Sequence, residues 1–263
     1  MKLGCCSWSY HRAIERGTLT IGQWLTLCAG QLGVEGVDLI AEQLRPSTPQ
    51  TWRDVKKRCA DLQLTIVSLS PSTDFGKPTA LGRRRQITAL QRWIEAASLL
   101  GAPLVRIFAG WAPADQRAAR WSAMVGCIRQ CARQAAQAGV TLAVEAHNHG
   151  GFISTSHEML RLIRELDSPW VRINLDTGNY DEPDPYKGFA RSLPWTAHVV
   201  AKVLRMRPNG EAMGFDYGRI VRLLKRGGYR GFVTLEYEGP ADEARAVPQA
   251  LAMLRRHGAA HGL

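Results

Sequence analysis

Four charged residues stand where runs of aliphatic and β-branched residues stop. They are Glu145, Asp176, Lys202 and Glu236, and each run has the composition of a buried strand. Helix-like stretches separate the runs, so we expect the strands to lie parallel. Because parallel strands in such a fold end at the same face, charged groups gathered there predict either a divalent metal site or proton-transfer chemistry.

The three acidic residues of this group favour a metal. Glu145, Asp176 and Glu236 would repel one another in a shared site, and the repulsion would raise their pKa values. A bound Mg²⁺ or Mn²⁺ removes that penalty, because both ions prefer oxygen ligands. We therefore expect a divalent metal cofactor, Mn²⁺ or Mg²⁺ first, with Zn²⁺ or Co²⁺ as alternatives.

Other polar residues near these strand ends are candidates for contacting a substrate. Arg106 lies between apolar neighbours, so we expect it to pair with an acid or a ligand. His147 shares the face of Glu145, and it is a candidate for either a metal ligand or a substrate contact. Asn179 follows a strand in a tight turn, where it either reaches a polyol hydroxyl or only forms the turn. Lys202 is expected to act electrostatically rather than as a Schiff base.

The whole chain alternates between short apolar runs and helical patterns. The apolar runs predict strands at Lys2–Ser9, Gly36–Ile40, Leu64–Ser70, Leu104–Ala109, Thr141–His147, Val171–Asp176, Thr196–Val203 and Phe232–Tyr237. The patterns between them predict helices at Ile21–Leu32, Pro49–Leu62, Gly82–Leu100, Ala114–Ala138, Thr155–Leu166, Pro185–Leu193, Phe215–Arg226 and Asp242–His257. Such a series of strand–helix units predicts a single (β/α)8 TIM barrel, and a doubly wound open sheet is the alternative.

The alternation within the strands favours closure into a barrel. In Val171–Asp176, the residues Val171, Ile173 and Leu175 form an apolar face, whereas Arg172, Asn174 and Asp176 form the other face. An apolar face under the helices, opposed by a face that becomes polar toward the carboxyl end, is expected of a catalytic barrel.

The composition narrows the class of protein. The chain has 263 residues and no linker-like or low-complexity segment, so we expect one domain over residues 1–263. Its six cysteines show no metal-binding spacing, no apolar stretch is long enough for a membrane helix, and Met1–Tyr10 is unlike a signal peptide, which together predict a cytoplasmic protein. The net charge is +11, but the basic residues are spread along helices without aromatic partners, so nucleic acid is not the favoured partner.

The chain resembles the xylose isomerase-like TIM-barrel superfamily of sugar phosphate isomerases and epimerases. The segments that carry the resemblance are Val140–His147, Asn174–Asn179, Ala197–Lys202 and Gly228–Glu238. The resemblance extends over nearly the whole chain. Its most specific parts are the Asp-Thr-Gly-Asn segment and the Gly-Tyr-x-Gly-Phe-x-x-Leu-Glu segment taken together.

The resemblance implies the roles of several residues. A divalent metal would be held by Glu145, Asp176 and Glu236 with a histidine of the seventh strand. Glu145 and Glu236 would also flank a sugar and exchange a proton bound to carbon. The chain departs from the family pattern at Val200, where the family commonly has that histidine. His198, two residues deeper, is then the expected fourth ligand if the strand register is locally shifted. Otherwise His198 is an outer-shell group, or the fourth ligand is water or His147.

These inferences predict an enzyme of carbohydrate metabolism. We expect a sugar isomerase or epimerase that acts on a ketose or keto-sugar through an enediolate. A lyase or dehydratase acting on a keto-glycoside or keto-polyol is the nearest alternative, because it shares the first proton transfer. A phosphodiesterase resembling endonuclease IV and a metal-free sugar-binding barrel are further alternatives. The expected partner is a small sugar, and a homo-oligomer is compatible with this class.

Overall fold

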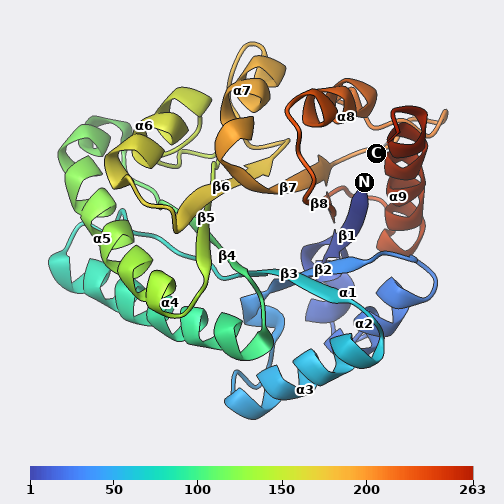
Figure 1. The fold of residues 1–263 in the computed structure, drawn as a ribbon, viewed down its shortest axis with the longest axis horizontal. Helices are drawn as coiled ribbons and strands as arrows, with labels where there is room; N and C mark the ends of the chain where they lie inside the picture. Colours follow the sequence, from blue (N-terminus) through green and yellow to red (C-terminus); the bar gives the residue numbers. More distant parts are fainter. Residues whose placement is uncertain (263) are drawn as a thin grey trace. The chain divides into compact units, whose positions relative to one another are not determined.

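The structure is a computed structural model that describes residues 1–262. Within these residues, eight parallel strands follow one another around a closed barrel in the order of the sequence (Figure 1). The strands are β1 (Lys2–Cys6), β2 (Gly36–Ile40), β3 (Thr65–Ser70), β4 (Leu104–Phe108), β5 (Thr141–Glu145), β6 (Val171–Asp176), β7 (Thr196–Val203) and β8 (Phe232–Tyr237). The TIM barrel expected from the sequence is therefore confirmed.

Helices connect the strands. They are α1 (His11–Glu15), α2 (Ile21–Ala29), α3 (Pro49–Asp61), α4 (Ala80–Leu100), α5 (Arg117–Gln137), α6 (Ser156–Leu166), α7 (Pro185–Ser192), α8 (Tyr217–Arg226) and α9 (Glu243–Ala260). Apart from the short α1, each corresponds to a helix expected from the sequence. Side-chain caps define several of the starts, as at α6, where Thr155 and Glu158 form a capping box.

The chain divides into two compact units. The first unit combines Met1–Val67 with His198–Leu263, and the second comprises Ser68–Ala197. The first unit therefore holds β1, β2, β8 and most of β7, together with α1, α2, α3, α8 and α9. The second holds β4, β5 and β6 with the four helices α4 to α7. Two strands, β3 and β7, contribute residues to both units.

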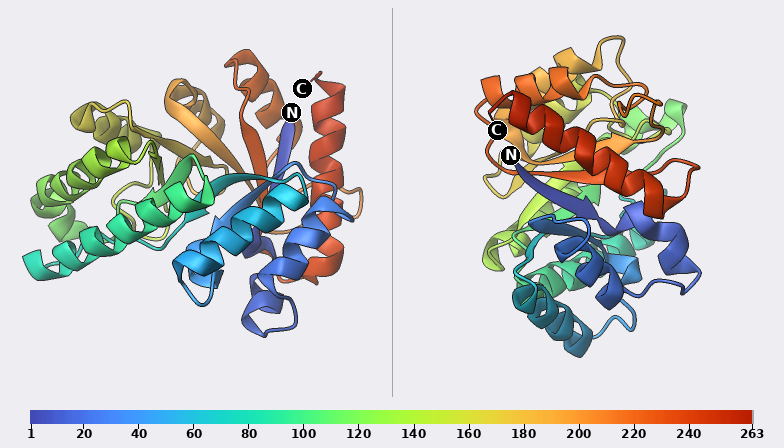
Figure 2. Two further views of the ribbon diagram at one scale, coloured as in Figure 1. Left: turned by 60° about the horizontal axis from the view of Figure 1, so that its bottom comes forward. Right: turned by 90° about the vertical axis from the view of Figure 1, so that its right-hand side faces the viewer.

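In the first unit, β1 lies between β2 and β8, and β7 pairs with the other side of β8. The helix α9 packs on β8, and Figure 2 shows α9 as the red helix beside the strands of this unit. Gly4 of β1 permits a close approach, because a Cβ atom there would lie 2.9 Å from Thr234 Oγ1. The pairing places Lys202 of β7 opposite Glu236 of β8.

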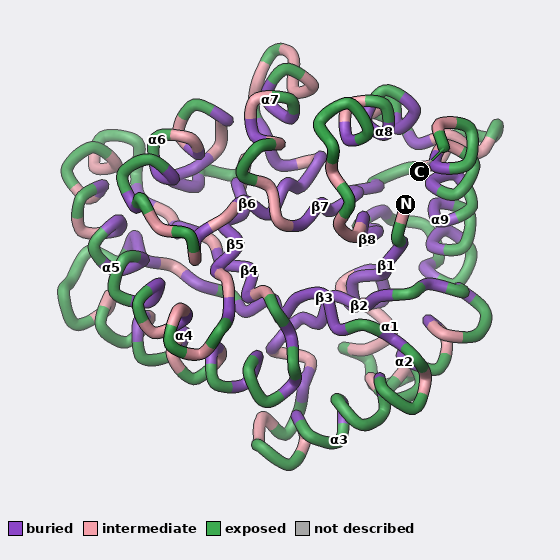
Figure 3. The backbone as a smooth tube through the Cα atoms, in the orientation of Figure 1, coloured by how far each residue is buried: buried purple, intermediate pink, exposed green. Residues whose placement is uncertain are grey.

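In the second unit, β5 lies between β4 and β6. The register aligns Phe108, Glu145 and Asn174 across the three strands. These strands are buried along almost their whole length, whereas the outer sides of the helices are exposed (Figure 3). The sequence-based prediction that Asn174 lies on a polar face is confirmed, because its amide bonds with the side chain of Glu145.

The first strand is shorter than the sequence predicts. It ends at Cys6, and Ser7–Tyr10 forms a 3-10 helix instead of continuing the strand to Ser9. The reason lies in two buried serine hydroxyls that replace backbone pairing. The Ser7 hydroxyl accepts from the Ile40 N–H at 2.9 Å. The Ser9 hydroxyl accepts from the Tyr237 N–H at 2.9 Å and donates to the Leu235 carbonyl at 3.1 Å.

All six cysteines are buried thiols without a disulfide. Over residues 1–262, none of the helices combines the length and the apolar character that crossing a bilayer requires.

The Ser9 hydroxyl provides a test of the fold. In the Ser9→Ala variant, the buried Tyr237 N–H and Leu235 C=O lose their partner, so the free energy of unfolding should fall by about 1–3 kcal/mol. Urea unfolding followed by circular dichroism measures the change. Ser122→Ala, at an exposed position of α5, is the matched control and should alter the midpoint little. Equal stability of the two variants would contradict the role of the Ser9 bridge.

Candidate active site

Glu145 is the centre of a polar cluster in the second unit. It is the last residue of β5 and is buried. Its carboxylate accepts hydrogen bonds from the amides of Asn174 and Asn179, the latter at 3.1 Å. Arg106 of β4 lies at 3.6 Å from the same carboxylate. Three of the residues predicted from the sequence, Arg106, Glu145 and Asn179, are therefore brought together.

The Arg106 side chain has two neighbours of different character. Its guanidinium forms the ion pair with Glu145, and it also lies over the ring of Phe108, at 4.2 Å from the ring centroid. An isolated charge in such a buried place would be costly, whereas a paired and stacked guanidinium is tolerated. The expectation that Arg106 pairs with an acid is thus met within this unit.

An aromatic wall stands beside this cluster, formed by Phe108, Trp111, His147 and His149. The His147 ring lies 5.2 Å from Phe108, 5.3 Å from Trp111 and 5.2 Å from His149, measured between ring centroids. The chain turns sharply just before Trp111, at Gly110, whose φ of +103° suits glycine. The first three rings are only half-buried and His149 is exposed, so part of this aromatic wall is accessible.

Asp176 ends β6 in the same unit. It is buried, and its Oδ1 accepts the Gly178 N–H at 2.7 Å, which fixes the turn that carries Asn179. The Gly178 carbonyl in turn accepts a bond from the Asn148 amide at 3.0 Å. The turn therefore positions Asn179 toward Glu145, and contact of Asn179 with a sugar hydroxyl stays a prediction.

The second polar cluster lies in the first unit. Lys202 and Glu236 face each other in register on β7 and β8, both are buried, and the ammonium donates to Glu236 Oε1. Lys202 also donates to Glu238 Oε2 at 3.1 Å. Burial raises the pKa of Glu238, but Lys202 and the Trp8 indole outweigh this effect and hold that pKa below its usual value. One ammonium is thus shared by Glu236 of β8 and by Glu238, which directly follows this strand.

His198 lies deeper in the same unit. Its ring is fully buried, and Nε2 lies 2.7 Å from Thr234 Oγ1. Thr234 is the register partner of Val200, the apolar residue that stands where the family commonly has a histidine. Coordination of a metal by His198 Nε2 would require the ring to give up its contact with Thr234.

Cys6 and Asp38 lie near the Lys202–Glu236 pair. Burial, followed by the charges of Asp38 and Glu236, raises the pKa of the Cys6 thiol well above its usual value. Cys6 is therefore a neutral thiol rather than a nucleophile. Asp38 is a buried carboxylate on β2 that the sequence analysis did not single out. Asp38 could have been identified from the sequence as an acidic residue inside the apolar run Gly36–Ile40.

Two other residues were missed as members of a site. Asn174 stands two residues before Asp176, so its position on the polar face was predicted but its bond to Glu145 was not. Glu238 stands two residues after Glu236 and shares its ammonium partner. In both cases the alternation of polar and apolar residues predicted the face on which the side chain lies. Its hydrogen-bond partner could be identified only from the way the neighbouring strands pair.

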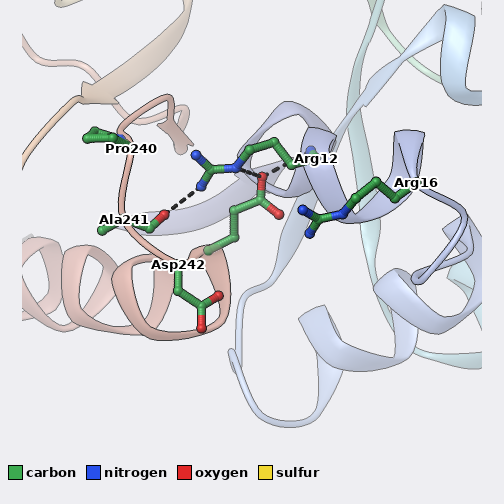
Figure 4. Close-up of a pocket in the computed structure, with 6 residues that line it drawn as sticks. Arg12, Arg16, Pro240, Ala241 and Asp242 are labelled. Atoms are coloured by element: carbon green, nitrogen blue, oxygen red, sulfur yellow. Dashed lines mark hydrogen bonds and ion pairs between the residues drawn. The ribbon is translucent and has the colours of Figure 1, made fainter.

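A surface hollow of about 360 Å³ lies elsewhere in the first unit. Figure 4 shows its lining residues, which are Arg12, Arg16, Pro240, Ala241, Asp242 and Glu243. The Arg12 guanidinium donates hydrogen bonds to Glu243 Oε1 at 3.0 Å and to the Gly239 carbonyl at 2.9 Å. These contacts tie α1 to the start of α9. None of the site residues predicted from the sequence lines this hollow.

The donor atoms for a metal can be considered one by one. Glu145, Asp176 and Glu236 provide carboxylate oxygens, the ligand type that Mg²⁺ and Mn²⁺ prefer, and a carboxylate accepts several bonds at once. With the side chains as they stand in residues 1–262, no group of three or more His, Cys, Asp or Glu is arranged to hold an ion. The oxygen donors thus suit a divalent ion chemically, but Lys202 already occupies Glu236 and Arg106 lies close to Glu145.

The chain belongs to the xylose isomerase-like TIM barrel family, whose model matches residues 28–257. This confirms the resemblance found in the sequence. No curated protein matches the chain in sequence.

Solved structures with the same fold include sugar-converting enzymes. The 3-keto-D-glucoside 4-epimerase YcjR from E. coli has a TM-score of 0.81 at 19% identity, covering 97% of this chain and 99% of that one. The D-psicose 3-epimerase from Clostridium cellulolyticum H10 has a TM-score of 0.80 at 17% identity, covering 98% of both chains. The probable 3-DHS dehydratase AsbF from Bacillus anthracis has a TM-score of 0.72 at 19% identity, covering 97% of this chain and 98% of that one. At these identities the likeness shows the fold.

The Asn174–Glu145 contact gives a test based on pH. In Asn174→Asp, the Glu145 charge raises the pKa of the new carboxyl group above its value in the unfolded chain. The variant should therefore be close to wild-type stability near pH 4 and lose about 1–3 kcal/mol as the pH rises toward 8. Urea midpoints across this range measure the loss.

Asn209→Asp is the matched control, because Asn209 is exposed. It should show no such growth of the deficit with pH. A deficit in Asn174→Asp that stays constant from pH 4 to pH 8 would mean that Asn174 does not lie against an ionised Glu145.

Proposed function

We propose that this protein is a sugar isomerase or epimerase that acts on a ketose or keto-sugar. Glu145 and Glu236 would be the groups that remove and return a proton bound to carbon. The observation that carries the proposal is that each of these buried glutamates stands at the carboxyl end of its strand with a basic side chain beside it. Active sites of TIM barrels are built at these strand ends.

The proton transfer would follow from the chemistry of the two glutamates. One glutamate acts as general base on the carbon next to the carbonyl, and the pair of electrons moves to the carbonyl oxygen to give an enediolate. Negative charge grows on that oxygen during the step. Lys202 and Arg106 would stabilise the charge, because both are preorganised by buried contacts and neither needs to be recruited from solvent.

The remaining predicted residues would orient the sugar. Asn179 holds Glu145 through one amide hydrogen and presents its other groups to a hydroxyl. His147 stands in the aromatic wall with Phe108 and Trp111, where a sugar ring finds both stacking surface and hydrogen-bonding nitrogens. These contacts would fix which carbon is presented to the glutamates.

A divalent metal, Mn²⁺ or Mg²⁺, is part of the same proposal. The residues that would hold it are Glu145, Asp176 and Glu236, with His198 as the fourth ligand if its ring leaves Thr234. Bound there, such an ion supplies a Lewis acid that polarises a carbonyl and its neighbouring hydroxyl. Lys202 and Arg106 would then turn from the carboxylates to the substrate oxygens.

Three outcomes share the first proton transfer. Return of the proton to the opposite face gives an epimer, return to the neighbouring carbon gives the isomer, and loss of a β-substituent gives a dehydration or lyase reaction. Structures of this fold include a keto-glucoside epimerase, a psicose epimerase and a probable dehydratase, which supports the common first step.

The proposed enzyme would consist of a single domain over residues 1–263. It would be cytoplasmic, a setting that suits its six free cysteines.

The roles of the two glutamates are tested by Glu145→Gln and Glu236→Gln. Each variant keeps the shape of the side chain but loses the base, so exchange of sugar hydrogens with D₂O should fall by about 100- to 10,000-fold. Proton NMR of candidate ketoses incubated in D₂O measures the exchange. Circular dichroism checks that both variants are folded.

Glu211→Gln provides the control, because the Glu211 carboxylate is bonded to Arg256 and His257, which belong to neither polar cluster. It should exchange sugar hydrogens at the wild-type rate. Undiminished exchange in both glutamine variants, with an active wild type, would end the assignment of proton transfer to these residues.

The metal is tested separately from turnover. After chelation and reloading, the protein should retain about one Mn²⁺ per chain, and Glu236→Gln should weaken binding by about tenfold or more. Electron paramagnetic resonance counts free and bound Mn²⁺ without any substrate. Wild-type protein that retains no Mn²⁺ after reloading would instead support a metal-free barrel.

A further inference from the structure

We propose that Glu238 is a positioning residue that holds the Lys202 ammonium beside Glu236, and that Trp8 fixes Glu238 in this role. The inference rests on the proposed function, in which Glu236 transfers a proton. Nothing in the family pattern discussed above assigns a role to Glu238 or to Trp8. Trp8, Lys202, Glu236 and Glu238 all belong to the first unit.

Both oxygens of the Glu238 carboxylate have a defined partner. Oε2 accepts from Lys202 Nζ at 3.1 Å, and Oε1 accepts from the Trp8 indole N–H at 3.0 Å. A carboxylate held at both oxygens cannot rotate freely. The indole therefore fixes the direction in which Glu238 faces Lys202.

The position of Glu238, one residue beyond the end of β8, explains how it acts on Lys202. Glu236 and Glu238 share a face of the chain and are separated by about 6–7 Å along a strand. The Lys202 side chain is a flexible stem with a compact charge at its tip, so nearby carboxylates decide where the tip lies. The ammonium donates to both acids, and it is thereby kept from folding onto Glu236 alone.

Exposure separates the roles of the two acids. The side chain of Glu238 is 40% exposed, whereas those of Glu236 and Lys202 are 11% and 9% exposed. Glu238 thus lies at the rim of the cluster, and Glu236 lies beneath it. A rim carboxylate that draws the ammonium outward places the charge where a substrate oxygen can reach it.

Trp8 is itself held in place. Its ring stacks on His11 with 4.5 Å between centroids, and His11 Nδ1 lies 2.8 Å from the Trp8 carbonyl oxygen. The 3-10 helix that carries Trp8 is bound to β8 through the Ser9 hydroxyl. A connected set of contacts thus extends from the end of β1 through Trp8 and Glu238 to Lys202.

The expected consequence of losing Glu238 is a change in rate rather than in substrate affinity. Without the charge of Glu238, the Lys202 ammonium keeps its bond to Glu236 and moves toward that carboxylate. A misplaced charge of this kind costs about 10- to 100-fold in rate. Substrate affinity should change little, because Glu238 acts through Lys202. A direct contact between Glu238 and the sugar would instead raise KM.

The experiment compares Glu238→Gln, Trp8→Phe and the double variant with the wild type. We expect kcat for hydrogen exchange to fall about 10- to 100-fold in Glu238→Gln, with KM within about threefold. Trp8→Phe should reproduce part of this loss, and the double variant should be no worse than Glu238→Gln because both act through one contact. Glu211→Gln is the matched control, since its side chain is 37% exposed and also has two side-chain partners.

A second readout does not depend on turnover. The Trp8 indole N–H resonance, assigned by its disappearance in Trp8→Phe, should move in Glu238→Gln and stay in place in Glu211→Gln. An unmoved resonance would overturn the contact itself. A moved resonance with wild-type kcat, or with a raised KM alone, would overturn the positioning role while the proposed function stands. Wild-type protein that exchanges no sugar hydrogen would overturn the proposed function, and this role with it.

Discussion

The buried glutamates near the ends of β5 and β8 are each held by a basic side chain from a neighbouring strand. Lys202 lies against Glu236 in one unit, and Arg106 with two asparagine amides surrounds Glu145 in the other. This constraint is physical, because a buried charge without a partner would cost more than the fold can lose. In the proposed function this arrangement would also serve catalysis, because groups that stabilise a resident carboxylate would be placed to stabilise charge that develops on a substrate.

The fold could be predicted from the sequence because its signals are local. Apolar runs and helical patterns alternate along the chain, and the observed strands match the apolar runs to within a few residues. The exception was the first strand, where the hydroxyls of Ser7 and Ser9 replace backbone pairing and end the strand at Cys6. A serine in an apolar run gives no sign of whether its hydroxyl will bond to a distant strand, so this ending depended on tertiary structure.

The candidate site was predicted in part for the same reason. Residues at strand ends, such as Glu145 and Glu236, were identified from the position at which each apolar run stops. Partners that depend on register across strands were missed, as with Asn174 and Glu238. At Val200 the chain lacks the expected histidine, and His198 is engaged by Thr234 one layer deeper. The chain thus differs from the family pattern in β7. Because the expected histidine is missing there, the basic residues beside the glutamates become more important to the proposed chemistry.

The central claim is that Glu145 and Glu236 act on the same carbon of a bound sugar. A crystal structure of the protein with Mn²⁺ and a ketose, determined with the inactive Glu236→Gln variant, tests it most directly. The account predicts a sugar whose carbonyl and neighbouring carbon lie within about 3–3.5 Å of residues 145 and 236, on opposite faces. A sugar bound away from both side chains, with neither Lys202 nor Arg106 in contact with a sugar oxygen, would contradict this claim.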